Sequence, residues 1–334
     1  MKERSRFSAW SSRGIWSAGP KLLALLLCLS AATIVSPSAS QPAHIYVADR
    51  IFGRQPDRVA IYPRSAHGDQ PPLRTITGGK TKLDFAQGVA VDAARNIYVS
   101  SFAAVTVYAA GRGGNVKPIQ NITGRATGLD VTGGIAVDGG ENIYVANNTF
   151  HLSDILVFAA GATGNVIPLR RIVGPHTALS IPNGIAVDSA GDAYVANTSY
   201  PTSITEYPPG AGGDVKPIVD ISGPNTQLDQ PEGLAVDAAG NIYVADHPSK
   251  SVLVYAAGAN GNAAPIRVIS GPKTTLTYPW GIAVDARKRI YVTNIAAPKS
   301  VSIFAADAND DAAPIRQLGG TKTKLDDPLG LAVR

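Results

Sequence analysis

A short motif, G-[IVL]-A-V followed by Asp in five of its copies, recurs six times in the sequence. The residue just before its glycine changes chemical character from copy to copy. These residues are Gln87, Gly133, Asn183, Glu232, Trp280 and Leu329. Asn183 and Glu232 would present a carboxamide and a carboxylate, oxygen donors that suit a hard cation such as Ca²⁺. The same groups, together with Gln87, would also hydrogen-bond a polar ligand, and Trp280 would add an aromatic surface.

A second polar set ends the strand that follows each phrase. Its members are Asp49, Ser100, Asn147, Asn197, Asp246 and Asn294, and aromatic residues follow at Phe52, Phe102, Phe150 and Tyr200. The loops after these strands vary widely, and binding usually resides in variable loops above a fixed scaffold. We therefore predict a ligand-binding face made of Gln87, Asn147, Asn183, Asn197, Tyr200, Glu232, Asp246, Trp280 and Asn294. Asn183 and Glu232 are its candidate metal ligands; the alternative is that the whole set only solvates this face.

The elements that position these residues follow from the repeat itself. The phrase G-[IVL]-A-V-D, a turn and a Tyr-containing strand recur at spacings of 46, 50, 49, 48 and 49 residues. Periods of 20–50 residues indicate solenoids, propellers or arrays. Each period reads as four short strands, and no stretch keeps a 3.6-residue helical period. The sequence therefore predicts an all-β repeat protein.

The two ends of the repeat array predict how it closes. The array begins at His44–Asp49 with a second strand, and it ends at Gly330–Arg334 with a first strand. All first and second strands can pair only if the chain forms a ring, which also hides the sheet edges. We predict one domain over residues 44–334, a six-bladed β-propeller of four-stranded blades. The C-terminal strand would pair with the N-terminal blade.

Several repeated residues are expected to be structural. The Asp that ends five of the six first strands (Arg334 ends the sixth) would accept turn amide hydrogens. The Thr in each connector would bond the backbone, with a Leu two residues later packing between blades. The segment 307–311 (Asp-Ala-Asn-Asp-Asp) resembles the start of a calcium loop, but Ala312 and Leu318 stand where that loop needs Gly and Glu. We expect it to be an ordinary turn.

The repeat resembles the NHL repeat. Pro231–Asp246 (PEGLAVDAAGNIYVAD), followed by Val252–Asn262 (VLVYAAGANGN), is similar to the pattern that joins P-x-G-[IV]-A-V-D to N-I-Y-V-A-D. The chain departs from it in the third strand, which lacks the Asn-x-Arg-Ile lead-in, and in a longer A-A-G-A-x-G-N loop. The resemblance implies a propeller but no single function, because this fold hosts binding proteins, scaffolds and enzymes.

Two enzyme groups with this fold provide the alternatives to a binding function. Peptidyl-hydroxyglycine lyases bind zinc through histidines near the channel. The histidines after the first forty residues are His44, His67, His151, His176 and His247. None precedes a repeated glycine, so no zinc site is expected. Lactonases resembling gluconolactonase and senescence marker protein hold a divalent cation with an acid and carboxamides, one of them in a Pro-Asn-Gly turn. Pro182-Asn183-Gly184 matches that turn and Glu232 supplies an acid, so this resemblance implies Ca²⁺ that polarises a lactone carbonyl and activates water.

Residues 1–39 have the pattern of a signal peptide. Five basic residues precede the 14-residue apolar run Leu22–Val35, which is shorter than the roughly 20 residues that span a bilayer. We predict cleavage near Ala39 and export to the periplasm or cell exterior, with an uncleaved anchor as the alternative. Because this segment holds five basic residues and one acid, the net charge falls from +5 to about +1 without it, which removes support for nucleic-acid binding.

These features together predict a secreted, non-catalytic propeller that binds a small polar molecule, a glycan, or a protein or peptide through one face. No cofactor is required in this interpretation, and no transmembrane span is expected after the leader. No Ser-His-Asp or Cys-His arrangement stands out in the sequence. The alternatives are a Ca²⁺-dependent lactonase and a purely structural envelope protein.

Overall fold

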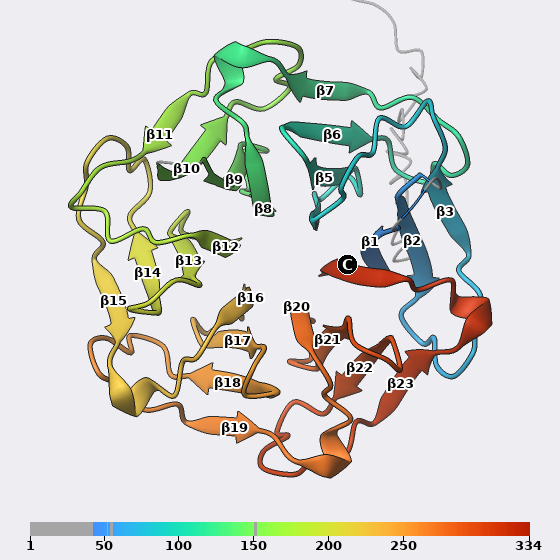
Figure 1. The fold of residues 1–334 in the computed structure, drawn as a ribbon, viewed down its shortest axis with the longest axis vertical. Helices are drawn as coiled ribbons and strands as arrows, with labels where there is room; N and C mark the ends of the chain where they lie inside the picture. Colours follow the sequence, from blue (N-terminus) through green and yellow to red (C-terminus); the bar gives the residue numbers. More distant parts are fainter. Residues whose placement is uncertain (1–42, 52, 54–55, 150–151) are drawn as a thin grey trace, which may run out of the picture. The chain divides into compact units, whose positions relative to one another are not determined.

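The computed structural model describes residues 43–51, 53, 56–149 and 152–334. Within these ranges the chain forms six four-stranded antiparallel sheets around a central axis (Figure 1). The predicted all-β, six-bladed propeller is thus confirmed. The predicted signal peptide, residues 1–39, lies outside the described residues, as do Phe52, Phe150 and His151. In the described ranges no helix is long and apolar enough to cross a membrane.

Each blade runs from an innermost to an outermost strand. Blades 1 to 3 are β24 (Asp327–Val333), β1 (His44–Arg50), β2 (Arg58–Pro63) and β3 (Arg74–Thr77); β4 (Gly88–Val91), β5 (Ile97–Ser101), β6 (Ala104–Tyr108) and β7 (Gln120–Thr123); and β8 (Val131–Val137), β9 (Ile143–Asn148), β10 (Ser153–Phe158) and β11 (Arg170–Ile172). Blades 4 to 6 are β12 (Pro182–Val187), β13 (Ala193–Asn197), β14 (Ser203–Tyr207) and β15 (Val219–Ser222); β16 (Pro231–Val236), β17 (Ile242–Asp246), β18 (Ser251–Tyr255) and β19 (Arg267–Ile269); and β20 (Pro279–Val284), β21 (Ile290–Asn294), β22 (Ser300–Phe304) and β23 (Arg316–Gly319).

Four of the connectors between blades contain a short 3₁₀ turn. These turns are η1 (Arg125–Thr127), η2 (Pro224–Thr226), η3 (Pro272–Thr274) and η4 (Thr321–Thr323). In all six connectors the predicted threonine hydroxyl donates to a glycine carbonyl three residues earlier, at 2.6–2.8 Å. The leucines two residues later pack against the cores between blades, as predicted.

The repeated phrase forms the hairpin of the two inner strands. In blade 5, Asp237 ends the first strand and its Oδ1 accepts the N–H groups of Ala239 and Asn241 at 2.8 and 3.0 Å. Its Oδ2 accepts the Tyr243 hydroxyl at 3.1 Å. Blades 2, 3 and 6 repeat both contacts, and Asp188 of blade 4 accepts turn amides. The predicted structural role of these aspartates is confirmed, which explains why Asp and Tyr recur together.

The hydrophobic core lies between the blades. Each of the six buried clusters joins strands of two neighbouring sheets; one of them packs Val47 and Tyr62 of blade 1 against Tyr291 and Ile303 of blade 6. The β-branched and aromatic residues of the middle strands suit this two-sided burial. A blade without its neighbour would expose one whole face, so the blades stabilise one another around the ring.

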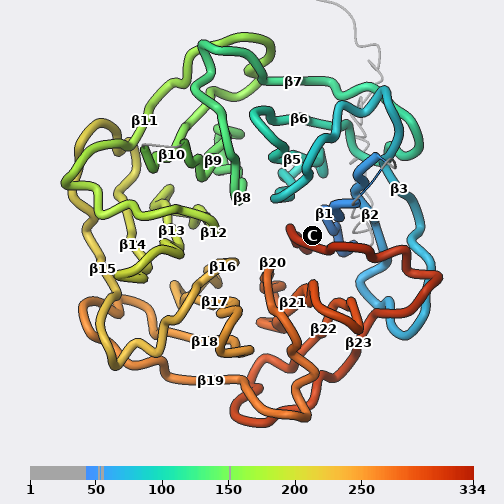
Figure 2. The backbone as a smooth tube through the Cα atoms, in the orientation of Figure 1, coloured from blue at the N-terminus to red at the C-terminus, as the bar shows by residue number. Residues whose placement is uncertain are grey.

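The last strand closes the ring. β24 pairs antiparallel with β1, with Ile45 opposite Val333 and Val47 opposite Leu331. The N–H of His44 donates to the carbonyl of Arg334 at 2.6 Å, and the reverse bond measures 3.0 Å. Figure 2 shows the C-terminal strand, in red, completing the blade that begins in blue. The predicted pairing of the C-terminal strand with the N-terminal blade is confirmed.

A second contact, which we call the clasp, ties each blade to the one before it. In blade 5 the long loop between strands three and four reaches back, and Gly261 forms a parallel bridge to Ile221. Asn262 Oδ1 then accepts the N–H of Asn225 at 2.7 Å. Every seam repeats this bond at 2.6–2.8 Å; the clasp residues are Asp69, Asn115, Asn165, Asp214, Asn262 and Asp311.

The clasp accounts for two sequence features. The loop that is longer than the NHL pattern is the loop that crosses the seam, and the segment 307–311 is its copy in blade 6. Gly223 opens the connector opposite Asn262 with a φ of +115°, and a Cβ there would lie 2.7 Å from the Asn262 Oδ1. Glycine is needed at this position for both reasons.

We expect Asn262→Ala to lower the melting temperature by about 2–4 °C, because it removes a hydrogen bond worth about 1 kcal/mol across a seam. Asn262→Asp is the matched control, since it keeps the accepting oxygen and three other clasps already use Asp. Thermal unfolding followed by circular dichroism measures both. Equal melting temperatures for wild type and Asn262→Ala would contradict a stabilising role for the clasp.

Candidate functional site

The innermost strands begin on one face of the ring, which we call the channel mouth. Six residues mark it, one per blade: Gln87, Gly133, Asn183, Glu232, Trp280 and Leu329. The innermost strands of neighbouring blades approach closely there, since a Cβ on Gly184 would lie 2.7 Å from the Glu232 carbonyl oxygen, and one on Gly330 would lie 2.6 Å from that of Gln87. The repeated glycines therefore permit this approach, and they make residues about 48 positions apart into neighbours.

Asn183 and Glu232 are joined at the channel mouth. The Asn183 Nδ2 donates to the Glu232 Oε2, which confirms that adjacent blades bring the two side chains together. Glu232 is only 5% exposed. Burial raises the pKa of Glu232 to about 7, the Asn183 hydrogen bond opposes that rise, and the nearby carboxylate of Asp246 adds to it. Glu232 can therefore gain or lose a proton near neutral pH.

Gly133 leaves the space that Asn183 occupies. A Cβ on Gly133 would lie 2.7 Å from the Asn183 Oδ1 and 3.1 Å from its Cα. Gly133 thus permits the carboxamide to sit beside blade 3, and a side chain at this position would clash with Asn183.

Three stacked rings lie beside this pair. The rings of His247 and Tyr278 have centroids 3.3 Å apart at 28°, and those of Tyr278 and Trp280 lie 6.2 Å apart at 19°. His247 Nδ1 lies 3.1 Å from Gln230 Oε1, and burial lowers the pKa of this histidine, favouring its neutral form. Burial raises the pKa of Tyr278, and the nearby carboxylate of Glu232 raises it further.

The sequence interpretation missed two members of this stack. Tyr278 stands two positions before Trp280, the spacing that places side chains on one side of an extended segment. His247 directly follows Asp246 in blade 5, the blade before the one that carries Trp280. The alternation at 278 and 280 was a usable signal for Tyr278, but nothing in the sequence showed that His247 would stack on the next blade.

Four predicted ligand-binding residues are not accessible. Asn147, Asn197, Asp246 and Asn294 are fully buried. Each accepts the N–H of the residue 17 positions earlier, at 2.8–3.1 Å. These side chains hold the connector that leads into their own blade. The expectation that they line an open rim is therefore corrected, because their oxygen and nitrogen atoms are already used by the protein.

Blade 2 lacks this anchor. Ser101, rather than Ser100, occupies the strand-end position, and its hydroxyl is buried without a hydrogen-bond partner in the described chain, as is that of Thr106. In blade 4 the equivalent Asn197 donates to the Thr205 hydroxyl at 3.1 Å. Blade 2 is thus the one blade whose strand end carries neither a carboxamide nor a carboxylate.

The two remaining predicted residues differ in their surroundings. Gln87 is half-buried at the mouth, and its N–H donates to the Ser100 carbonyl at 2.9 Å. Tyr200 is 92% exposed and lines a separate cavity of about 350 Å³ with Pro224, Leu228 and other residues. Neither Asn183 nor Glu232 lines that cavity. Trp280, in the ring stack, is half-buried.

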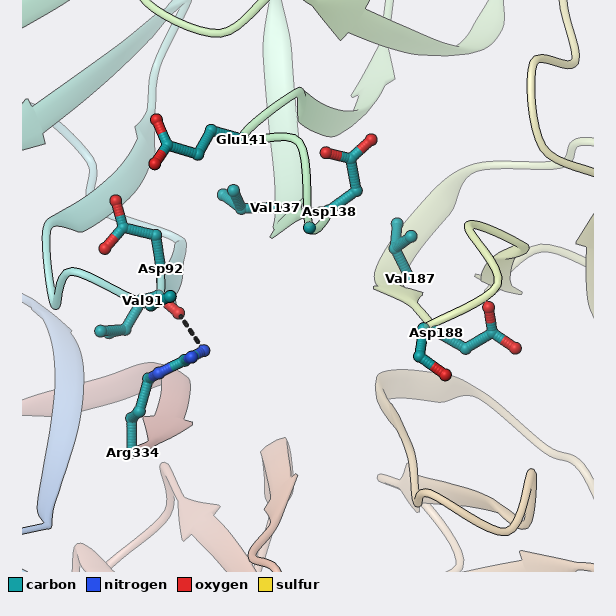
Figure 3. A pocket seen from close by; sticks show the side chains of 11 residues that line it. Val91, Asp92, Val137, Asp138, Glu141, Val187, Asp188 and Arg334 are labelled. Carbon is teal, nitrogen blue, oxygen red and sulfur yellow. Dashed lines mark hydrogen bonds between the residues drawn. The ribbon is translucent and has the colours of Figure 1, made fainter. Parts of the chain in front are cut away.

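The opposite end of the channel holds an acidic pocket of about 240 Å³ (Figure 3). Asp92, Asp138, Asp188 and Glu141 line it, and the Arg334 guanidinium donates to the Val91 carbonyl at 3.3 Å. The three aspartates are the turn acceptors described above. Their oxygens are therefore engaged in structure, and this pocket is a weaker candidate than the channel mouth.

The channel mouth supplies few ligands for a metal. Within the described ranges, no group of three or more His, Cys, Asp or Glu side chains could hold one. Asn183 and Glu232 provide oxygen donors but bond each other, and both Asp246 oxygens accept loop amide hydrogens. Leu329 is fully buried. Since Ca²⁺ takes six to eight oxygens, these residues fit it poorly and we derive no step through a metal.

The fold and the mouth define a class of protein: a six-bladed β-propeller that gathers a buried carboxyl group, a carboxamide and stacked rings on one face. The NHL repeat matches residues 228–255, and the chain folds as a six-bladed β-propeller. No curated protein matches its sequence.

Solved structures share the fold. A protein of unknown function from Bacteroides caccae has a TM-score of 0.63 at 14% identity, over 88% of this chain and 99% of that one. A gluconolactonase from Xanthomonas campestris has a TM-score of 0.53 at 19% identity, over 87% of this chain and 91% of that one. At these identities the similarity shows the fold alone.

We expect Glu232→Gln to reduce the pH dependence of stability. The folded state holds this proton more tightly than the unfolded chain, so the associated stability is present below pH 4.5 and is lost as pH rises through about 7. The loss is on the order of 3 kcal/mol. Urea unfolding at pH 5 and pH 8 measures it, with the exposed Glu141→Gln as the control. An identical pH dependence in wild type and Glu232→Gln would contradict the buried, readily protonated carboxyl.

We expect Ser101→Asn to raise the melting temperature by about 2–4 °C, because the new carboxamide would bond Thr106 and the N–H of Asp84, as Asn does in other blades. Asn294→Ser, the reverse change in blade 6, should lower it. Calorimetry of both variants checks the pair. A lower melting temperature for Ser101→Asn would show that blade 2 has no room for the anchor.

Proposed function

We propose that the protein is a non-catalytic recognition propeller that binds a small polar ligand of the sugar type at the channel mouth. The observation that carries this proposal is the Asn183–Glu232 pair with the Tyr278–Trp280 rings near it, since the Glu232 charge acts on Tyr278 and raises its pKa. Stacked rings offer a flat apolar surface, while carboxyl and carboxamide groups hydrogen-bond hydroxyls. Sugars present both kinds of surface.

The state of Glu232 supports a neutral ligand. Near pH 7 its carboxyl is partly protonated, so it can donate as well as accept a hydrogen bond. A sugar hydroxyl can match either state because it also does both. The Asn183 carboxamide and the Glu232 carboxyl already bond each other in the free protein. A ligand can exchange this bond for its own contacts, which favours binding over a catalytic role in which Glu232 activates a water.

The predicted leader supports a function outside the cytoplasm. Residues 1–39 would direct the chain to the periplasm or cell exterior, where a binding protein meets sugars, glycans or peptides from the surroundings.

The test is calorimetric titration of the full chain with glucose, gluconate and glucono-1,5-lactone. We expect at least one to bind, and Trp280→Ala to weaken it at least tenfold while leaving the melting temperature within a few degrees. Phe102→Ala, which removes an exposed aromatic side chain from another blade, is the control and should bind as wild type does. Binding that survives Trp280→Ala unchanged would contradict the site, and absence of binding to all three would contradict the ligand class.

Lactone hydrolysis assisted by Ca²⁺ is the second candidate function. It is favoured by the Pro182-Asn183-Gly184 turn beside Glu232 and by the shared fold of the Xanthomonas campestris gluconolactonase. The donor set counts against it, because Asn183 and Glu232 bond each other and both Asp246 oxygens accept loop amide hydrogens. The same preparation discriminates the two: hydrolysis of glucono-1,5-lactone that requires Ca²⁺ and is abolished by Glu232→Ala would establish the lactonase and overturn the non-catalytic proposal.

A further inference from the structure

Three lysines converge on a pocket at the seam between blades 1 and 2. The pocket measures about 390 Å³ and is lined by Gly79, Lys80, Lys82, Lys117, Pro118 and Asn121. All three lysines are exposed. None of them forms an ion pair with any residue in the described part of the chain, so three positive charges face the pocket without a neutralising acid.

The clasp brings these lysines together. Lys80 and Lys82 belong to the connector that leaves blade 1, whereas Lys117 lies in the long loop of blade 2. The Lys80 N–H donates to Asn115 Oδ1 at 2.7 Å, two residues before Lys117. Lys82 has a φ of +66°, the left-handed conformation in which this connector position also occurs in other blades. The backbone contacts therefore hold the two segments side by side before any ligand binds.

Comparison with the other five seams shows that this cluster is particular to one place. The residues at the three positions are Ala126, Gly128 and Ile167; His176, Ala178 and Lys216; Asn225, Gln227 and Ala264; Lys273, Thr275 and Ala313; and Lys322, Lys324 and Pro71. Only the seam between blades 1 and 2 carries a basic residue at all three. The repeat thus provides the same geometry six times and the full charge once.

The clasp residue at the seam between blades 1 and 2 also differs in charge from those at other lysine- or histidine-bearing seams. At the three other seams where the residue that donates to the clasp is basic, the clasp residue is an aspartate. His176 pairs with Asp214 at 2.6 Å, Lys273 Nζ lies 3.8 Å from Asp311, and Asp69 accepts the N–H of Lys322. At this seam the clasp is Asn115, which makes the same backbone bond without a charge. The positive potential of the pocket is therefore left uncompensated.

We propose that this pocket, which we call the lysine seam, binds a tetrahedral oxyanion, a phosphate or sulfate group carried by a small ligand. Lysine ammonium groups act as point charges on such groups, and three of them around one pocket add their attraction. The Asn121 side chain adds a polar contact, and Pro118 an apolar wall. At about 390 Å³ the pocket exceeds a bare ion, so it accommodates part of the molecule that carries the anion. The site is separate from the channel mouth and does not depend on the function proposed there.

The test is calorimetric titration of the full chain with inorganic pyrophosphate at low salt. We expect binding that Lys80→Ala/Lys82→Ala/Lys117→Ala weakens at least tenfold, and that weakens as salt screens the charges. The matched control is Lys322→Ala/Lys324→Ala/Lys216→Ala, which removes the same three charges from equivalent repeat positions at other seams. The control should bind within twofold of wild type, and circular dichroism should show both triple variants folded.

Two results would overturn the proposal: no pyrophosphate binding by wild type, or equal weakening in the two triple variants, which would mean that net charge alone attracts the anion. A second arm identifies the source of the anionic group. Sedimentation with phosphatidylcholine vesicles containing phosphatidic acid, lost in the lysine-seam variant but not in the control, would support a lipid headgroup. Pyrophosphate binding without vesicle binding would support a soluble ligand.

Discussion

The pairing of β24 with β1 closes the ring, so that each blade packs between two neighbours. The closure carries charges as well as backbone bonds. Asp49 is fully buried, accepts the Arg58 Nε at 2.6 Å and the N–H of Asp327 at 2.7 Å, and Arg50 pairs with Asp327 in turn. Burial raises the pKa of Asp49 even though Arg58 opposes it. A buried pair of this kind is costly to break by removing one partner, which favours this register of closure over a shifted one.

The clasps and shared cores carry that closure around the ring. Each seam has the same backbone bridge, the same Asn or Asp acceptor and a leucine packed between two sheets, so the scaffold is nearly symmetric. Function requires that the symmetry be broken, and it is broken by single residues. Glu232 and Leu329 occupy equivalent positions at the channel mouth, as do Asn115 and Asp311 in the clasps. One substitution in a fixed geometry changes a neutral position into a charged one.

Much of the scaffold was predictable from particular residues. The Asp and Tyr of the repeated phrase, the connector threonines and the unmatched terminal strands each had one physical interpretation, and the structure confirms it. The strand-end residues had two possible interpretations, as ligand-binding groups or as structural groups. Asn197 and Asp246 are as polar as any ligand-binding group, and only the packing shows that they are spent on the amide hydrogens of Ser180 and Asp229. Conversely, His247 and Tyr278 come from different blades, and their stacking could not be foreseen from either segment alone.

The sequence by itself determined the fold, because strand propensity, turn chemistry and repeat spacing are local properties that each copy states again, and because the two half-units at the ends leave only one closed arrangement. The placement of Asn183 beside Glu232 was also foreseeable once neighbouring blades were known to touch. Tertiary structure alone decided which polar atoms remain free, how deeply Glu232 is buried, and which lysines meet across a seam. Burial, desolvation and charge compensation depend on contacts between residues tens of positions apart, and no local pattern contains them.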